Sequence, residues 1–151
     1  MNEIVFDNRK NARSGHAVIE MALLAPFIFF LFAGAFDMGY YVYAAVAVEN
    51  AARVATLHVA ASSDIASDAN AAAFARTYVC NELRVLPNVG STCPTSVVSV
   101  SVPAQPFSGT DGDPATQVSV TYTTVPLVSI PGLNAGPQGR WTFTRVVQMR
   151  L

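Results

Sequence analysis

The sequence contains few charged residues, and their signs nearly cancel. Charged side chains make up 13% of the 151 residues, and the formal net charge is −1. Proteins that bind nucleic acid usually present a basic patch. Here the only lysine is Lys10, and the arginines are scattered through the chain. The composition therefore gives no electrostatic support for a nucleic-acid partner.

Histidine and cysteine are also scarce, which removes most known catalytic and metal-binding patterns. The two histidines, His16 and His58, stand far apart within one predicted helix. The sequence has no serine-hydrolase elbow, no Walker loop and no zinc-protease helix motif. Asp111-Gly-Asp113 lacks the acidic run and the terminal Glu of a calcium loop, so we interpret it as a turn. The sequence thus predicts neither an enzyme nor a cofactor.

The longest uniform feature is an apolar run near the N-terminus. Residues 17–36 contain one ionisable side chain, Glu20. A helix of this length rises about 30 Å, close to the thickness of a bilayer's hydrocarbon core. Pro26 lacks a backbone donor inside this run, which predicts a helix kink there; a proline tolerated in a membrane helix is the alternative.

The helical pattern continues beyond the apolar run. Tyr40, Tyr41 and Tyr43 follow it, at the position of an aromatic belt at the outer membrane interface. Alanine, the strongest helix former, is frequent from there to about residue 60. We therefore predict one long N-terminal helix at 16–60, with a transmembrane part at about 17–43.

The residues before the apolar run set its orientation. Residues 1–15 form a polar leader that contains Arg9, Lys10 and Arg13. Basic residues flanking the first apolar helix hold that end in the cytoplasm. The chain beyond about Tyr43 should therefore lie outside the cytoplasm.

Glu20 suggests that the leader is removed. A carboxylate at the centre of a membrane helix costs about 2.5–3.5 kcal/mol on insertion scales, and less near an interface. If the chain were cut after Gly15, the new amine on His16 would place a cation close to Glu20. That cation could neutralise Glu20 within one helix or between neighbouring copies. In an uncut chain Glu20 would instead reach the headgroups or be protonated.

These features together resemble a known kind of leader. A basic segment that ends in glycine, followed by four residues, a glutamate and an apolar helix, is similar to the class III signal peptide of type IV pilins and pseudopilins. The segment 13–60 further resembles the TadE family of tight-adherence (Tad/Flp) pseudopilins. The residues that match the pattern are Gly15, Glu20, Pro26, Gly34, Asp37, Gly39 and Ala51-Ala52-Arg53.

The resemblance implies a processing site and a class of protein. A prepilin peptidase would cut between Gly15 and His16, which makes Glu20 the fifth residue of the mature chain. Met21 stands where the major pilin of these systems usually carries tyrosine. That departure, together with the sizeable C-terminal region, indicates a minor pseudopilin rather than the small major pilin.

The resemblance also implies partners and a location. The partners would be the prepilin peptidase, other Tad pseudopilins and pilin subunits, the inner-membrane assembly platform and the lipid bilayer. The protein would cross the bacterial inner membrane once, with its N-terminus cytoplasmic and its C-terminal domain periplasmic or carried on a pilus. Its role would be to support Tad pilus biogenesis, adhesion and biofilm formation.

Two other interpretations of the apolar run stay open. Met21–Phe32 has the length of a secretory signal core, and Ala33-Gly34-Ala35 fits its cleavage site. A cut after Ala35 would release a secreted domain that begins at Phe36. Glu20 and the continuing helical pattern speak against this cut. The second alternative is an uncleaved single-pass anchor that carries a binding module.

The rest of the chain, residues 61–151, predicts an extracytoplasmic domain that begins with a second helix. This helix is expected at about 66–86, with Asp64 or Ser67 as its N-cap. Cys80 and Cys93 flank its end, and outside the cytoplasm they are expected to form a disulfide worth about 3 kcal/mol. Two free cysteines are the alternative, and a metal site would lack ligands.

The remainder of this domain is predicted to form β-strands. Three stretches alternate apolar and polar residues, at 96–102, 117–125 and 140–149. The third stretch places Arg145 on its otherwise apolar face. Three strands covered by a helix can bury a modest core. We therefore predict an α+β fold with a long pilin-like helix, a second helix and a small antiparallel sheet of about three strands.

Overall fold

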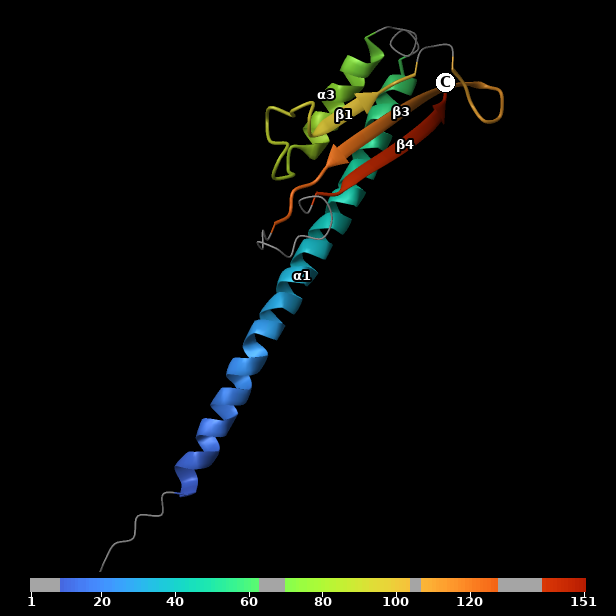
Figure 1. Ribbon diagram of the computed structural model, residues 1–151. Helices are drawn as coiled ribbons and strands as arrows, with labels where there is room; N and C mark the ends of the chain where they lie inside the picture. Colours follow the sequence, from blue (N-terminus) through green and yellow to red (C-terminus); the bar gives the residue numbers. More distant parts are fainter. Residues whose placement is uncertain (1–8, 63–69, 104–106, 128–139) are drawn as a thin grey trace, which may run out of the picture. The chain divides into compact units, whose positions relative to one another are not determined.

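The computed structural model describes residues 9–62, 70–103, 107–127 and 140–151. Two compact units divide the chain, residues 1–38 and residues 39–151. The elements in chain order are α1 (Arg9–Ala60), α3 (Ala71–Leu83), β1 (Val98–Ser101), β2 (Phe107–Ser108), β3 (Pro114–Thr123) and β4 (Thr142–Arg150) (Figure 1). The predicted α+β fold, with a long apolar N-terminal helix, is confirmed.

The first unit is the N-terminal part of α1. The helix begins at Arg9, so the end of the predicted leader is helical, and helical backbone continues on both sides of Pro26. Every large apolar side chain from Val18 to Met38 is between 42% and 75% exposed. A segment of α1 is long and apolar enough to cross a membrane, by length and composition.

The second unit contains the C-terminal part of α1, which is amphipathic: one of its faces is buried in the core of the unit. Its buried residues recur every three or four positions and so share one face of the helix. Most of them are small. These residues are Tyr40, Ala44, Val48, Ala51, Ala52, Ala55 and Val59.

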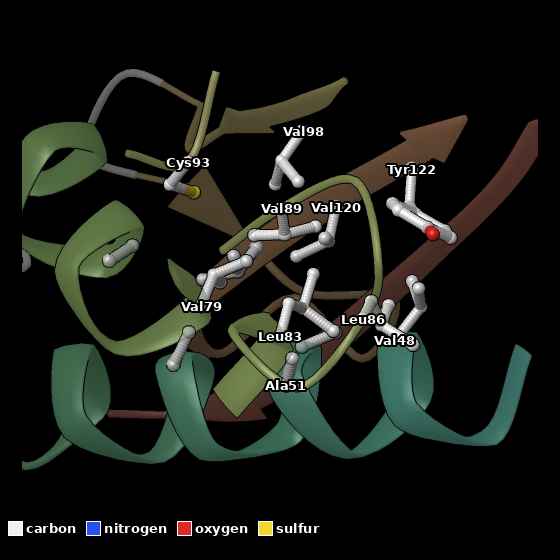
Figure 2. Close-up of a cluster of buried hydrophobic side chains, with 14 of the residues drawn as sticks. Val48, Ala51, Val79, Leu83, Leu86, Val89, Cys93, Val98, Val120 and Tyr122 are labelled. Carbon is white, nitrogen blue, oxygen red and sulfur yellow. The ribbon is translucent and has the colours of Figure 1, made fainter. Parts of the chain in front are cut away.

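The sheet is antiparallel, with β3 at its centre. One side of β3 pairs with β1 and with the two-residue β2, and the other side pairs with β4. Val118, Val120 and Tyr122 alternate along β3 and are fully buried, as the sequence pattern predicts. Helices α1 and α3 cover this inner face, and Val98 and Val120 belong to one buried cluster with side chains of both helices (Figure 2).

Helix α3 is shorter than predicted. Its N-cap is Asn70, and the predicted caps Asp64 and Ser67 lie outside the described residues. The helix ends at Leu83 rather than at residue 86, because the chain then turns. The turns carry Leu86 and Val89 into the core, where they are 1% and 2% exposed.

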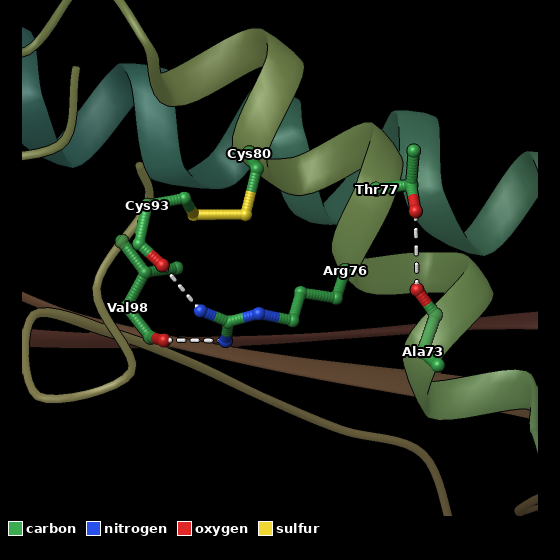
Figure 3. The surroundings of a disulfide bond; sticks show 6 residues. All are labelled: Ala73, Arg76, Thr77, Cys80, Cys93 and Val98. Carbon is green, nitrogen blue, oxygen red and sulfur yellow. Dashed lines mark hydrogen bonds between the residues drawn. A yellow bond between two sulfur atoms is a disulfide. The ribbon is translucent and has the colours of Figure 1, made fainter. Parts of the chain in front are cut away.

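A disulfide joins the end of α3 to the loop that follows it. Cys80 and Cys93 are bonded, with their α-carbons 5.7 Å apart, so the predicted disulfide is confirmed. Arg76 lies one turn earlier and donates to the carbonyl oxygens of Cys93 and Val98, at 2.5 Å and 2.8 Å (Figure 3). Cys93 has φ +44°, a conformation that favours glycine. The disulfide and the Arg76 hydrogen bond together hold it there.

Arg145 on β4 is accommodated by an ion pair. Its Nε lies 3.4 Å from Oε2 of Glu49 on α1, and the other carboxylate oxygen of Glu49 lies 3.1 Å from Arg53. Both cations keep access to solvent, because their side chains are 45% and 63% exposed. The residue that looked misplaced on an apolar face therefore faces a carboxylate at the sheet's margin.

Candidate functional site

The predicted cleavage site lies within the helical part of the first unit. Gly15 and His16 are both in α1. A Cβ added at Gly15 would meet nothing within 4 Å. Packing in this unit therefore does not require glycine at this position. Any requirement for glycine at this position would come from a protein that recognises the segment around it.

His16 and Glu20 are brought together one helical turn apart. The Nε2 atom of His16 lies 3.3 Å from Oε1 of Glu20, and the two side chains are 78% and 66% exposed. The sequence pattern predicts a cation at the backbone amine of His16 after cleavage, whereas the structure brings the imidazole of His16 to Glu20 in the uncut chain. The spacing of four residues was the available signal, since such pairs meet on a helix.

Glu20 sits among exposed apolar neighbours. Val18, Ile19 and Met21 beside it are each more than 60% exposed. Leu23, on the next turn, is 75% exposed. This arrangement places one carboxylate on a surface that would otherwise favour an apolar environment. Pro26 lies on the turn after that, and the predicted kink at Pro26 stays a prediction.

The tyrosines that follow the apolar run do not share one environment. Tyr40 is only 8% exposed, and its hydroxyl lies 2.9 Å from that of Tyr122. Tyr122 donates its one proton to Oδ1 of Asn88 at 2.5 Å, so Tyr40 is the donor in the first bond. Tyr40 therefore belongs to the core of the second unit and is not available to a membrane interface, contrary to the prediction.

Burial has an electrostatic consequence for this pair. Desolvation by burial is the largest cause, and it raises the pKa of Tyr122 above its usual value near 10. The amide of Asn88 also donates to the backbone oxygen of Thr123 at 2.7 Å. The chain of hydrogen bonds thus ties α1, the loop after α3 and β3 together. Both phenols are held neutral inside the unit at ordinary pH.

Residues 15–56 match the family model described as TadE-like protein. The chain carries a TadE-like domain. No curated protein and no solved structure matches the chain. The matched segment begins at Gly15 and includes Glu20 and Pro26, which confirms the resemblance seen in the sequence. The sheet and α3 lie beyond it.

The TadE-like domain implies the general class of the protein. The family consists of Tad pilus assembly components with a hydrophobic N-terminal helix, and it is generally non-enzymatic. The exposed apolar surface of α1 agrees with membrane anchoring. The TadE-like match therefore points to a Tad system as the source of partners.

The carboxylates near the β2–β3 turn already have a cation. Nη2 of Arg150 lies 2.7 Å from Asp111 and 3.4 Å from Asp113. This guanidinium offsets part of the negative charge of the two carboxylates in the segment interpreted as a turn. Within the described ranges, no group of three or more potential ligands is placed to hold a metal ion.

Proposed function

We propose that this protein is a minor pseudopilin of a Tad pilus system. The chain enters the inner membrane with its N-terminus in the cytoplasm, loses residues 1–15 to a prepilin peptidase, and assembles through α1. The observation that supports this best is the TadE-like match, which begins at Gly15, next to the expected cut. The mature chain then consists of a helix at 16–60 and an extracytoplasmic domain at 61–151. The transmembrane part, predicted at about 17–43, would end before Tyr40, because Tyr40 is buried in the second unit.

The glycine at the expected cut would make cleavage easier. The peptide bond between Gly15 and His16 is helical in the uncut chain, so the helix must open before a peptidase can act. Glycine lowers the cost of leaving a helix by about 0.5–1 kcal/mol relative to alanine. The open space around Gly15 leaves its surroundings free to adapt to the enzyme.

Cleavage would also change the charge beside Glu20. The new α-amine on His16 has an ordinary pKa of about 7.7–8.0 and so carries mostly positive charge at neutral pH. It belongs to the residue whose imidazole already lies 3.3 Å from Glu20. Pairing with a cation lowers the cost of keeping a carboxylate in an apolar layer. The same amine on one subunit could pair with Glu20 of the next during assembly.

The extracytoplasmic domain would present its surface to partners outside the membrane. The disulfide between Cys80 and Cys93 suits an oxidising compartment such as the periplasm. At the tip of a pilus or in a priming complex, this domain would support adhesion and biofilm formation. The assembly platform and the other pilin subunits would contact α1.

The test is the N-terminal sequence and intact mass of the protein purified from its native membranes. A chain that starts at His16 supports the proposal. A start at Met1 would replace it with an uncleaved anchor. A start at Phe36 would favour the secreted domain, and the structure permits that outcome because the second unit begins at Gly39.

A matched pair of variants isolates the role of Gly15. Gly15→Val should block the cut, because a branched side chain replaces the residue that the peptidase reads. Gly34→Val is the control, since Gly34 also lies in α1 with nothing within 4 Å of an added Cβ. Equal processing of the two variants would contradict the assigned cleavage site.

A further inference from the structure

The second unit carries an aromatic cluster at the N-terminal end of its helical segment. Trp141, the only tryptophan of the chain, lies against Tyr41 with ring centroids 6.2 Å apart. Trp141 is 51% exposed, and Tyr43 is 54% exposed. A tryptophan usually gains from burial of its large ring. Half of this ring is left uncovered within the unit.

Hydrogen bonds hold the backbone of Trp141, the residue that carries the exposed indole. Its backbone N–H donates to Oγ1 of Thr124 at 2.9 Å, and its carbonyl oxygen accepts from the backbone N–H of Thr124 at 2.8 Å. Thr124 is fully buried. These bonds anchor the backbone of Trp141 at the end of the β3–β4 ladder.

The position of the cluster along the chain points to a particular partner. Tyr41 follows Met38 by three residues, so the α-carbons cannot be more than about 11 Å apart. Met38 is the last of the exposed apolar side chains of the first unit. Tryptophan and tyrosine rings prefer the boundary between lipid headgroups and acyl chains. Arg140, exposed and next to Trp141 in the chain, suits the phosphates of that boundary.

We propose that Trp141 and Tyr41 form a contact with the outer headgroup region of a lipid bilayer, and that Tyr43, which lies on another face of α1 two residues further along, reaches the same region. This inference rests on the proposed membrane insertion of α1. The predicted aromatic belt of Tyr40, Tyr41 and Tyr43 is thereby revised. Tyr40 belongs to the core instead, and Trp141 is added from the end of the β3–β4 ladder. The contact fixes the end of the sheet that carries Trp141 toward the membrane until assembly removes the protein from the lipid.

The single tryptophan makes the test direct. The full chain is reconstituted at low protein density into liposomes of phosphatidylcholine and phosphatidylglycerol. Some of the lipids carry bromine on the acyl chain, either near the glycerol or near the terminal methyl. We expect bromine near the glycerol to remove most of the Trp141 fluorescence, bromine near the methyl end to remove less, and aqueous iodide to have little effect.

A control variant moves the reporter away from the proposed contact. Trp141→Phe combined with Val146→Trp places the only tryptophan five residues further along β4, about 17 Å away. Val146 is 55% exposed, so the new ring should stay in water. Its fluorescence should be quenched by iodide and not by either brominated lipid.

The outcomes separate this inference from the proposed function. Flotation of the protein with the liposomes, read beside the fluorescence, reports insertion of α1; a protein that does not float overturns both proposals. A protein that floats while iodide quenches Trp141 as it quenches the control overturns the lipid contact alone. Blue-shifted emission that neither quencher reduces would place Trp141 against another protein or a second copy, and would also overturn it.

Discussion

The hydrogen-bond chain that links Tyr40, Tyr122 and Asn88 allows a quantitative test of how residues 39–60 of α1 are joined to the sheet. The perturbation is Tyr122→Phe, which removes one hydroxyl and keeps the ring. Tyr122 is fully buried, and its oxygen accepts from Tyr40 while its proton goes to Asn88. The substitution therefore deprives both neighbours of a partner.

The expected loss follows from counting these partners. A buried polar group left without a partner costs about 1–3 kcal/mol. Asn88 keeps one hydrogen bond, to Thr123, so we expect Tyr122→Phe to lower the free energy of unfolding by about 2–3 kcal/mol. Tyr40→Phe removes one bond and leaves Tyr122 able to donate, so its cost should be about 1 kcal/mol. The double variant should cost about 1 kcal/mol less than the sum, because both substitutions remove the same bond.

The assay is denaturant unfolding of the full chain in detergent micelles. Trp141 fluorescence and circular dichroism report on the second unit, whose only tryptophan lies at the sheet's end. Tyr43→Phe is the control, since Tyr43 is 54% exposed, and it should change stability by less than about 0.5 kcal/mol.

Two results would refute this reasoning. A Tyr122→Phe variant as stable as the Tyr43→Phe control would show that the hydroxyl contributes nothing to stability. Full additivity of Tyr40→Phe and Tyr122→Phe would show that the two hydroxyls do not interact.

Three further predictions concern charge, the disulfide and pH. Glu20→Ala should reduce surface piliation, measured by electron microscopy, while membrane insertion and disulfide formation stay normal, because Glu20 lies outside the second unit. Cys80→Ala with Cys93→Ala should lower the free energy of unfolding by about 3 kcal/mol, since a short loop is no longer closed. Stability should fall as the pH rises above about 10, because the unfolded chain loses the Tyr122 proton before the folded chain does. Tyr122→Phe should flatten that fall.

Each of these has a contrary result. Unchanged piliation in Glu20→Ala would remove the charge-neutralising role of that carboxylate. A double cysteine variant of native stability would show that turns and the Arg76 hydrogen bonds alone hold the loop. Parallel stability curves for Tyr122→Phe and the unaltered chain above pH 10 would mean that this phenol titrates alike in both states.

Local patterns in the sequence were enough for the elements of the fold. The apolar run at 17–36 predicts a helix suited to a membrane, because the length and composition of one segment decide that property. The alternation along 117–125 likewise predicts a strand with Tyr122 on the buried face. The separation of Cys80 and Cys93 was short enough to favour a disulfide. The leader pattern around Gly15 was sufficient for the resemblance that the TadE-like match confirms.

Local patterns could not assign the partners of individual side chains. Nothing near Tyr40 in the chain distinguishes it from Tyr41, yet one bonds to Tyr122, 82 positions away, and the other packs on Trp141. Arg145 appeared misplaced until the structure put it beside Glu49. Such pairs depend on the register of the sheet and on which helical face it covers. Tertiary packing sets both, because it buries together apolar side chains that are far apart in the sequence. The sequence by itself therefore determined the apolar helix and the strands. Only the tertiary structure decided which aromatic residues lie together.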